Sequence, residues 1–146
     1  MKVALITSSE QPVYFFPELA AVLVERVSDL EIEEFFVPFG FDIPFQAKAC
    51  KNFDAVLACY HYDSDQTATA ALVIDKLVDV ELSTGVKIVK AVEPIFDEDL
   101  DREEDLAAFK DALVEKWSNM LLGVLYDSSV FKPAQPSDSA ESDEEK

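Results

Sequence analysis

The stretch FDAVLACY, residues 53–60, decides the fold, because it is apolar enough to form a strand that is buried on both faces. Strands of this kind are typical of parallel sheets that are covered by helices on either side. Three other stretches have the pattern of strands: KVALITS (2–8), EIEEFFV (31–37) and VKIVKAV (86–92). The sequence therefore predicts a sheet of four strands.

Helical stretches alternate with these strands. They are expected at residues 17–27, 44–51, 66–82 and 101–126. This alternation favours parallel strands joined by right-handed crossovers, which place helices on both faces of one sheet. We therefore expect an α/β protein built in layers.

The composition sets limits on size and on partners. At 146 residues, of which 49% are hydrophobic, the chain has room for one folded domain. It carries 30 acidic against 12 basic residues, a formal net charge of -18. This charge repels nucleic-acid phosphates and anionic membrane surfaces, so we expect neither a nucleic-acid nor a membrane partner.

Two local features bear on the cellular compartment. The opening residues, MKVALITSSE, contain neither a membrane span nor the cleavage site of a signal peptide, which favours a cytoplasmic protein. Cys50 and Cys59 lack the spacing of a metal site and lie in apolar segments. They are expected to be reduced, packed thiols, and no metal is expected.

The last residues differ in composition from the rest. Residues 1–133 are expected to form the α/β domain. Residues 134–146, AQPSDSAESDEEK, hold five acids, one lysine and no large apolar residue, which predicts a disordered acidic tail. The serines of this tail lie among acids and are also candidates for phosphorylation by an acid-directed kinase.

The helical stretch 66–82 is apolar over a wide arc. At 100° per residue its apolar side chains cover roughly 200°, about twice the arc that contact with one sheet needs. A second surface must cover the remainder, and we expect a closed homo-oligomer to supply it. The alternative is that the carboxy-terminal helix covers it. Glu81 is the one residue that does not fit this apolar pattern.

Ligands of parallel α/β sheets bind outside the carboxyl ends of the strands. The loops in question here are 8–16, 38–44, 60–66 and 93–99. Glycine-rich nucleotide loops are excluded, because the chain has only three glycines. The turn VPFGFDIPF (37–45) instead combines two prolines with three aromatic rings, which suits a flat heterocycle. The alternative is a simple aromatic packing corner.

Three segments together resemble the lumazine synthase family. FVPFGFDIPFQAK (36–48) is similar to the Val-Pro-Gly-Ala-Phe-Glu-Ile-Pro stretch of these enzymes. FDAVLAC (53–59) is similar to the strand that follows it, and VDVELSTGVKIVKAV (78–92) to the next helix end, Thr-Gly-Val turn and fourth strand. The resemblance covers residues 1–126 and extends to the archaeal type of riboflavin synthase.

The resemblance implies a four-stranded parallel sheet in a flavodoxin-like three-layer sandwich of the lumazine synthase type. It also implies a homopentamer, or a multiple of five subunits, with active sites between neighbours and no cofactor. Lumazine synthases act in riboflavin biosynthesis, where they condense a ribitylamino-pyrimidinedione with a four-carbon keto phosphate to give 6,7-dimethyl-8-ribityllumazine. Archaeal-type riboflavin synthases need no phosphate pocket.

The same resemblance assigns residues to a binding site for a lumazine or flavin. Three residues of the proline-framed turn would hold the ribityl chain. The ring that stacks on the heterocycle in the family is not in place, and any one of three aromatic residues after the first strand could substitute for it. These substrate-binding residues are Gly40, Phe41, Asp42, Tyr14, Phe15 and Phe16.

The segment CYHYDSDQTATA (59–70) departs from the family. It lacks the Gly-Glu-Thr or Gly-Asp-Thr phosphate loop, and His61, the sole histidine, lies at the strand end instead of on the following helix. His61 is the candidate acid–base group. Two functions therefore stay open. One is a transferase of riboflavin biosynthesis, either lumazine synthase or archaeal-type riboflavin synthase. The other is a catalytically degenerate homo-oligomeric scaffold or flavin-binding protein of the same fold.

Overall fold

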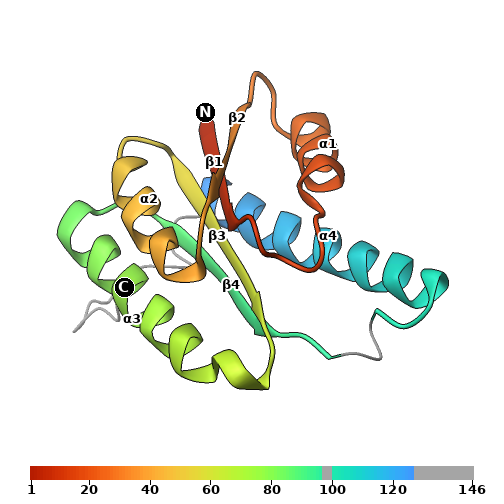
Figure 1. Cartoon of the computed structure of the whole chain (residues 1–146). Coiled ribbons are helices and arrows are strands. Elements are labelled where there is room, and N and C mark those ends of the chain that lie inside the picture. The colour runs from red at the N-terminus through yellow and green to blue at the C-terminus, as the bar shows by residue number, and fades with distance from the viewer. Residues whose placement is uncertain (97–99, 127–146) are drawn as a thin grey trace, which may run out of the picture.

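The computed structural model, which describes residues 1–96 and 100–126, contains one sheet of four parallel strands in the order β2-β1-β3-β4. This is a flavodoxin-like three-layer α/β fold (Figure 1), as the sequence predicts. The strands are β1 (Lys2–Ser8), β2 (Glu31–Val37), β3 (Ala55–Tyr62) and β4 (Ile88–Pro94). The α-helices are α1 (Phe16–Arg26), α2 (Ile43–Ala49), α3 (Thr67–Thr84) and α4 (Glu103–Tyr126), and two 3-10 turns are η1 (Gly40–Asp42) and η2 (Ser64–Gln66).

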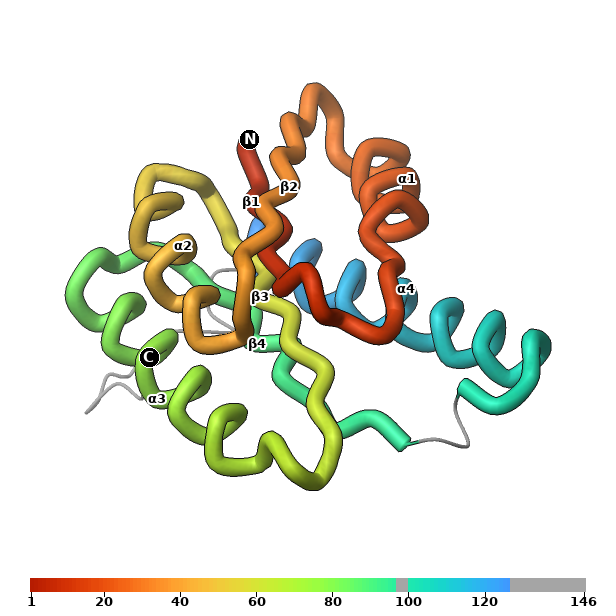
Figure 2. Tube along the Cα trace, viewed as in Figure 1, coloured from red at the N-terminus to blue at the C-terminus, as the bar shows by residue number. Residues whose placement is uncertain are grey.

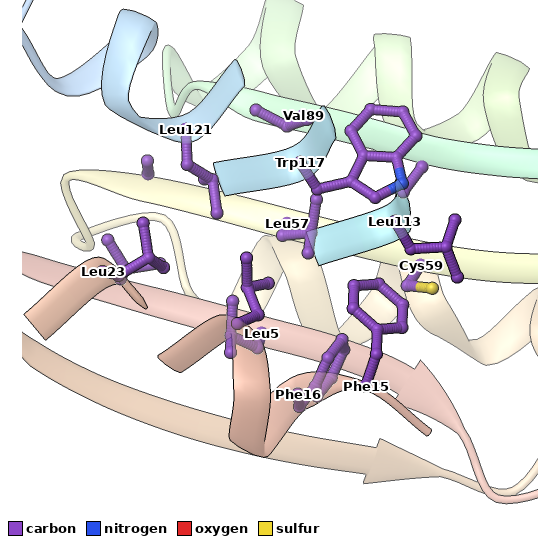
Figure 3. Close-up of a cluster of buried hydrophobic side chains, with 14 of the residues drawn as sticks. Leu5, Phe15, Phe16, Leu23, Leu57, Cys59, Val89, Leu113, Trp117 and Leu121 are labelled. Carbon is purple, nitrogen blue, oxygen red and sulfur yellow. The ribbon is translucent and has the colours of Figure 1, made fainter. Parts of the chain in front are cut away.

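Two hydrophobic clusters fill the space on either side of the sheet. Helices α1 and α4 pack on one face, and α2 and α3 pack on the other (Figure 1). Neighbouring residues of a strand alternate between the clusters, so Leu5 of β1 faces α1 and α4 while Ile6 faces α2 and α3. Figure 3 shows the first cluster, in which Trp117 and Leu121 of α4 lie over Leu57 of β3.

Strand β3 is buried on both faces, as its composition predicts. It begins and ends two residues later than expected, because its pairing with β4 continues through His61 and Tyr62, which lie opposite Glu93 and Pro94. The amide of Ile95 then donates to the Tyr62 carbonyl at 2.8 Å. His61 therefore lies at the end of the strand, as expected, whereas the expectation that the following loop begins at residue 60 is wrong.

Helix α3 buries one face only in this chain. Its buried residues face the sheet, whereas its outer side leaves apolar side chains exposed, and Leu82 is 81% exposed. The other exposed apolar residues of this side are Leu72, Ile74 and Val78. Helix α4 packs on the opposite face of the sheet, so the alternative that it covers the outer side of α3 is wrong.

Glu81, the residue that does not fit the pattern of α3, has a structural role. One of its carboxylate oxygens accepts a hydrogen bond from Lys90 Nζ at 2.5 Å, and the other accepts from the Ile88 amide at 3.1 Å. Both side chains are mostly shielded from solvent. Glu81 therefore ties the end of α3 to the start of β4.

The remaining expectations concern thiols, membranes and the tail. Cys50 and Cys59 are buried and form no disulfide, as expected. Among the helices of the described residues, none has the length and apolar character needed to cross a bilayer. The acidic tail at 134–146 lies outside the described residues.

Candidate functional site

The loops that follow β1, β3 and β4 meet at one end of the sheet (Figure 2). A cavity of about 260 Å³ lies there, beside the point between β1 and β3 where the strand order reverses. Each of the three loops contributes to its wall. The lining residues are Ser8, Glu10, Pro12, Tyr60, His61, Asp63, Gln66, Ile95 and Leu100.

His61 is a buried polar residue of this cavity, with only 4% of its surface exposed, and Ser8 is another. The ring of His61 lies between the rings of Phe15 and Phe109, with both pairs of centroids 6.1 Å apart. The Nδ1 atom is 3.9 Å from the Cys59 sulfur. The Nε2 atom is buried and has no hydrogen-bond partner within the described residues.

An unpartnered buried nitrogen loses the hydrogen bonds that water would offer, so it calls for an explanation. Trp117 Nε1 is the other such side-chain atom in the described part of the chain. Trp117 packs in the hydrophobic cluster under α4 and does not line this cavity. His61 Nε2 is therefore the unpartnered atom that belongs to a cavity residue, where a ligand could satisfy it.

The surroundings of His61 favour its neutral form. Burial is the largest effect and lowers the pKa of the imidazole below its usual value of 6.5. The Glu93 carboxylate acts in the opposite sense and raises this pKa, while the Lys116 ammonium lowers it. A neutral imidazole can accept a proton or a hydrogen bond from a ligand.

The cavity wall is acidic. Glu10 and Asp63 line it, and none of the described lining residues is a lysine or an arginine. Burial is the largest cause that raises the pKa of the Tyr60 phenol. The negative charges of Glu10 and Asp63 raise this pKa further. Asp63 also caps η2, since its carboxylate accepts from the Asp65 amide at 3.0 Å. The wall therefore disfavours an anion and offers acceptors to hydroxyl and amine groups.

A second cavity of about 400 Å³ adjoins the first. The two share Asp63 and Ile95 in their walls. The other residues of the second cavity are Tyr62, Ser64, Thr67, Pro94 and Phe96. Volumes of this size are in the range of small-molecule sites, so this end of the sheet has room for a ligand larger than the first cavity alone.

The proline-framed turn forms a separate aromatic corner, defined here as residues 39–42. Gly40 packs against the Tyr60 ring so closely that a Cβ atom would lie 2.4 Å from it. The rings of Phe39 and Phe41 stack with centroids 5.4 Å apart, and both are exposed. The Asp42 carboxylate accepts from the Phe39 amide at 3.1 Å, which closes the turn.

The aromatic corner touches the His61 cavity only through Tyr60. None of Gly40, Phe41 and Asp42 lines that cavity. Phe41 instead borders a groove of about 400 Å³ between α2 and α3. The structure of a single chain therefore places the residues assigned to ribityl binding beside the cavity and not in its wall.

The three aromatic residues after β1 are divided between the core and the surface. Phe15 and Phe16 are fully buried in the cluster under α1 and α4 (Figure 3). Tyr14 is partly exposed at the β2 side of the sheet, where its hydroxyl donates to Glu34 and its ring lies 5.6 Å from that of Phe36. Of the three, only Tyr14 presents its ring to solvent.

Sequence reasoning named the loops of the cavity but missed most of its polar residues. Ser8, Glu10, Asp63 and Gln66 were not singled out, although each lies at or just after the carboxyl end of a predicted strand. That position is the signal that could have found them. Within the described residues, no group of three or more His, Cys, Asp and Glu side chains could hold a metal ion.

No protein-family model matches the chain, and no curated protein matches it significantly.

Proposed function

We propose that the chain binds a heterocycle of the lumazine or flavin type in the cavity at the carboxyl ends of the strands. We further propose that it acts in riboflavin biosynthesis and forms riboflavin from 6,7-dimethyl-8-ribityllumazine. The observation that carries this proposal is that His61, whose buried Nε2 atom has no partner within the described residues, lines a cavity whose described lining includes acceptors and no lysine or arginine. The resemblance of residues 36–48 and 78–92 to the lumazine synthase family suggests the class of ligand.

The charge of the wall favours one of the two riboflavin-pathway reactions. Lumazine formation uses a keto phosphate, whose negative charge would meet Glu10 and Asp63 with no lysine or arginine among the lining residues. Riboflavin formation from lumazine involves no phosphate, and the ribityl hydroxyls can donate to these carboxylates. The geometry therefore supports the archaeal type of riboflavin synthase better than lumazine synthase.

The chemistry of this reaction matches the presence of two adjoining cavities. Riboflavin has four more carbon atoms than lumazine, so a second lumazine must donate them and leave as the ribitylamino-pyrimidinedione. His61 Nε2 would take a proton from a methyl carbon of one lumazine, and the resulting carbanion would attack a ring carbon of the other. Once both methyl carbons of the first lumazine have bonded to ring carbons of the second, the two carbon–nitrogen bonds of that four-carbon unit break. The protons lost from the methyl carbons, one of them carried by the imidazolium, end on nitrogens of the departing pyrimidinedione. No external oxidant or reductant is needed.

We also propose that a second copy of the chain covers the outer side of α3 in a homopentamer or a multiple of five. The exposed apolar residues of α3 support this, together with Phe41 and Phe45, of which Phe45 is 83% exposed. These two rings border the groove that α2 forms with α3. Apolar surface of this extent is typical of a subunit interface.

Light scattering on the purified chain tests the assembly. We expect a mass that is a multiple of five subunits, and Leu82→Glu should dissociate it because it places a charge on the exposed side of α3. Val24→Glu is the matched control, since Val24 is an exposed apolar residue of α1 on the opposite face of the sheet. A single subunit at micromolar concentration would contradict the proposed assembly.

A product assay tests the catalytic proposal. The chain is incubated with lumazine alone and, separately, with the pyrimidinedione and the keto phosphate, and the products are separated by chromatography. Riboflavin in the first incubation supports the proposal. Lumazine formed in the second incubation would overturn it in favour of the other reaction.

The second candidate is a protein that binds the heterocycle without converting it. The missing phosphate loop in residues 59–70 favours this reading. Quenching of riboflavin or lumazine fluorescence measures binding independently of turnover. Binding without product would support the scaffold or binding function, and the absence of both binding and product would reject the two candidates together.

A further inference from the structure

We propose that Lys116 neutralises the Glu93 carboxylate beside His61 and so keeps the imidazole in its neutral form. The catalytic consequence of this pairing rests on the proposed function, because it sets the pH range in which Nε2 can take a proton from a ligand. Its electrostatic part concerns the protein alone and can be tested without any ligand.

The backbone places Glu93 beside His61. The two residues are partners across β3 and β4, and partners in parallel strands project to the same face of the sheet. This face is the one covered by α4, because the ring of Phe109 lies against the imidazole. Glu93 is therefore the carboxylate of the adjacent strand on the His61 side.

Helix α4 supplies the opposite charge. Lys116 Nζ donates to the Glu93 carboxylate and lies 4.7 Å from the centroid of the Trp117 ring. The carboxylate and the ring both attract an ammonium group, so they hold it over this part of the sheet. Lys116 and Glu93 come from different elements, and their pairing depends on how α4 packs.

The other groups around His61 are carboxylates of the cavity wall, an uncharged thiol and apolar rings. Glu10 comes from the loop after β1 and Asp63 from the loop after β3, and both lie in the cavity wall. On β3 itself, burial raises the pKa of the Cys59 thiol, which stays protonated and uncharged. The remaining neighbours, Phe15 and Phe109, are apolar. The Glu93 carboxylate raises the pKa of His61 and the Lys116 ammonium lowers it.

Removing the charge of Lys116 and removing the charge of Glu93 should therefore change the pKa of His61 in opposite directions. Without Lys116, the unpaired Glu93 carboxylate stabilises the imidazolium. Without the Glu93 charge, the unpaired Lys116 ammonium destabilises it. A purely structural role of the pair would not produce two shifts of opposite sign.

The sequence makes the measurement simple, because His61 is the only histidine of the 146 residues. Its imidazole NMR signals are titrated with pH in the full chain and in Lys116→Met and Glu93→Gln. We expect the pKa of His61 to rise by about one unit in Lys116→Met and to fall in Glu93→Gln. The double variant should return close to the wild-type value.

The chain offers a matched control on the same helix. Lys110 of α4 pairs with Glu18 of α1 at 3.0 Å, so this ion pair joins α4 to α1 and not to the strand beside His61. Lys110→Met should leave the titration unchanged. The proposal is overturned if Lys116→Met changes the pKa of His61 no more than Lys110→Met does. It is also overturned if Lys116→Met and Glu93→Gln change this pKa in the same direction.

A second readout separates this inference from the proposed function. If riboflavin is formed, the acid limb of its kcat/KM profile should move with the pKa of His61 in both variants. Opposite shifts in the NMR titration with no turnover in any variant would uphold the pair and reject the catalytic proposal. Turnover with a profile that neither variant moves would reject the pair as a catalytic device.

Discussion

The aromatic corner and the His61 cavity lie on either side of Tyr60, yet they differ in how their polar groups are used. In the corner, the Asp42 carboxylate already accepts from the Phe39 amide, and Gly40 fills the space against the Tyr60 ring. His61, which lines the cavity, has a buried Nε2 atom without a partner within the described residues. The Asp42 carboxylate of the corner is thus already paired, whereas a residue of the cavity wall carries an unpaired nitrogen.

The most distinctive stretch of the sequence is therefore not the part of the molecule that holds an unpaired polar group. Prolines, glycine and aromatic rings make residues 37–45 stand out, and the structure uses much of this composition to build a tight turn. His61 is a single residue at the end of an apolar strand, and its burial beside an acidic cavity strengthens its candidacy as the acid–base group. The following predictions test this contrast.

The largest effect is expected from His61→Asn. The variant removes the proton acceptor, so riboflavin formation should fall by about 100-fold or more, while lumazine affinity should fall only by the smaller amount that the loss of one hydrogen bond causes. The measurement is kcat from product formation, with fluorescence quenching for affinity. Equal turnover by the variant and the wild type would remove His61 from the reaction.

Gly40→Ala should chiefly affect folding. The added Cβ would lie 2.4 Å from the Tyr60 ring, and such overpacking costs about 1–3 kcal/mol. Urea unfolding measures the loss. Adding Tyr60→Leu to the variant should recover part of it, because the smaller side chain frees the space. If Gly40→Ala alone is as stable as the wild type, the close packing of the corner is not as described.

Asp42→Ala distinguishes a turn from a ligand contact. Loss of the hydrogen bond to the Phe39 amide should lower the free energy of unfolding by about 0.5–1.5 kcal/mol. Lumazine affinity should stay within about threefold, which is less than the loss of a direct hydrogen bond to a ligand would cause. A much larger loss of affinity with unchanged stability would restore the ribityl-binding role that the resemblance assigns to Asp42.

The smallest effect is a dependence of stability on pH. Because burial lowers the pKa of His61 below 6.5 in the folded chain, the unfolded chain binds this proton more readily. The contribution of His61 is therefore complete above pH 6.5 and is lost as the pH falls through the folded-state pKa. Urea unfolding at several pH values should show a steeper loss in the wild type than in His61→Asn. Parallel curves would indicate that His61 is not buried.

The fold was predictable because it depends on local patterns. Apolar runs and helical periodicity placed the four strands and four α-helices within two residues of their observed ends. The placement of His61 was not predictable in this way, because only pairing with Glu93 of β4 extends β3 beyond residue 60.

The candidate site also depends on tertiary packing. Phe15 and Phe16 are aromatic residues that could stack on a heterocycle, yet α1 and α4 enclose both rings in the core. The acidity of the cavity arises from Glu10 and Asp63, which are far apart in sequence and meet only once β1 and β3 are neighbours. No pattern within one segment of the sequence predicts that these two residues line the same cavity.

The most direct measurement is a lumazine titration followed through the imidazole signals of His61. The account predicts that these signals shift and saturate as lumazine binds, and shift before those of the Phe39 and Phe41 rings. Imidazole signals that stay fixed while those two rings respond would contradict the account, because the ligand would then occupy the aromatic corner.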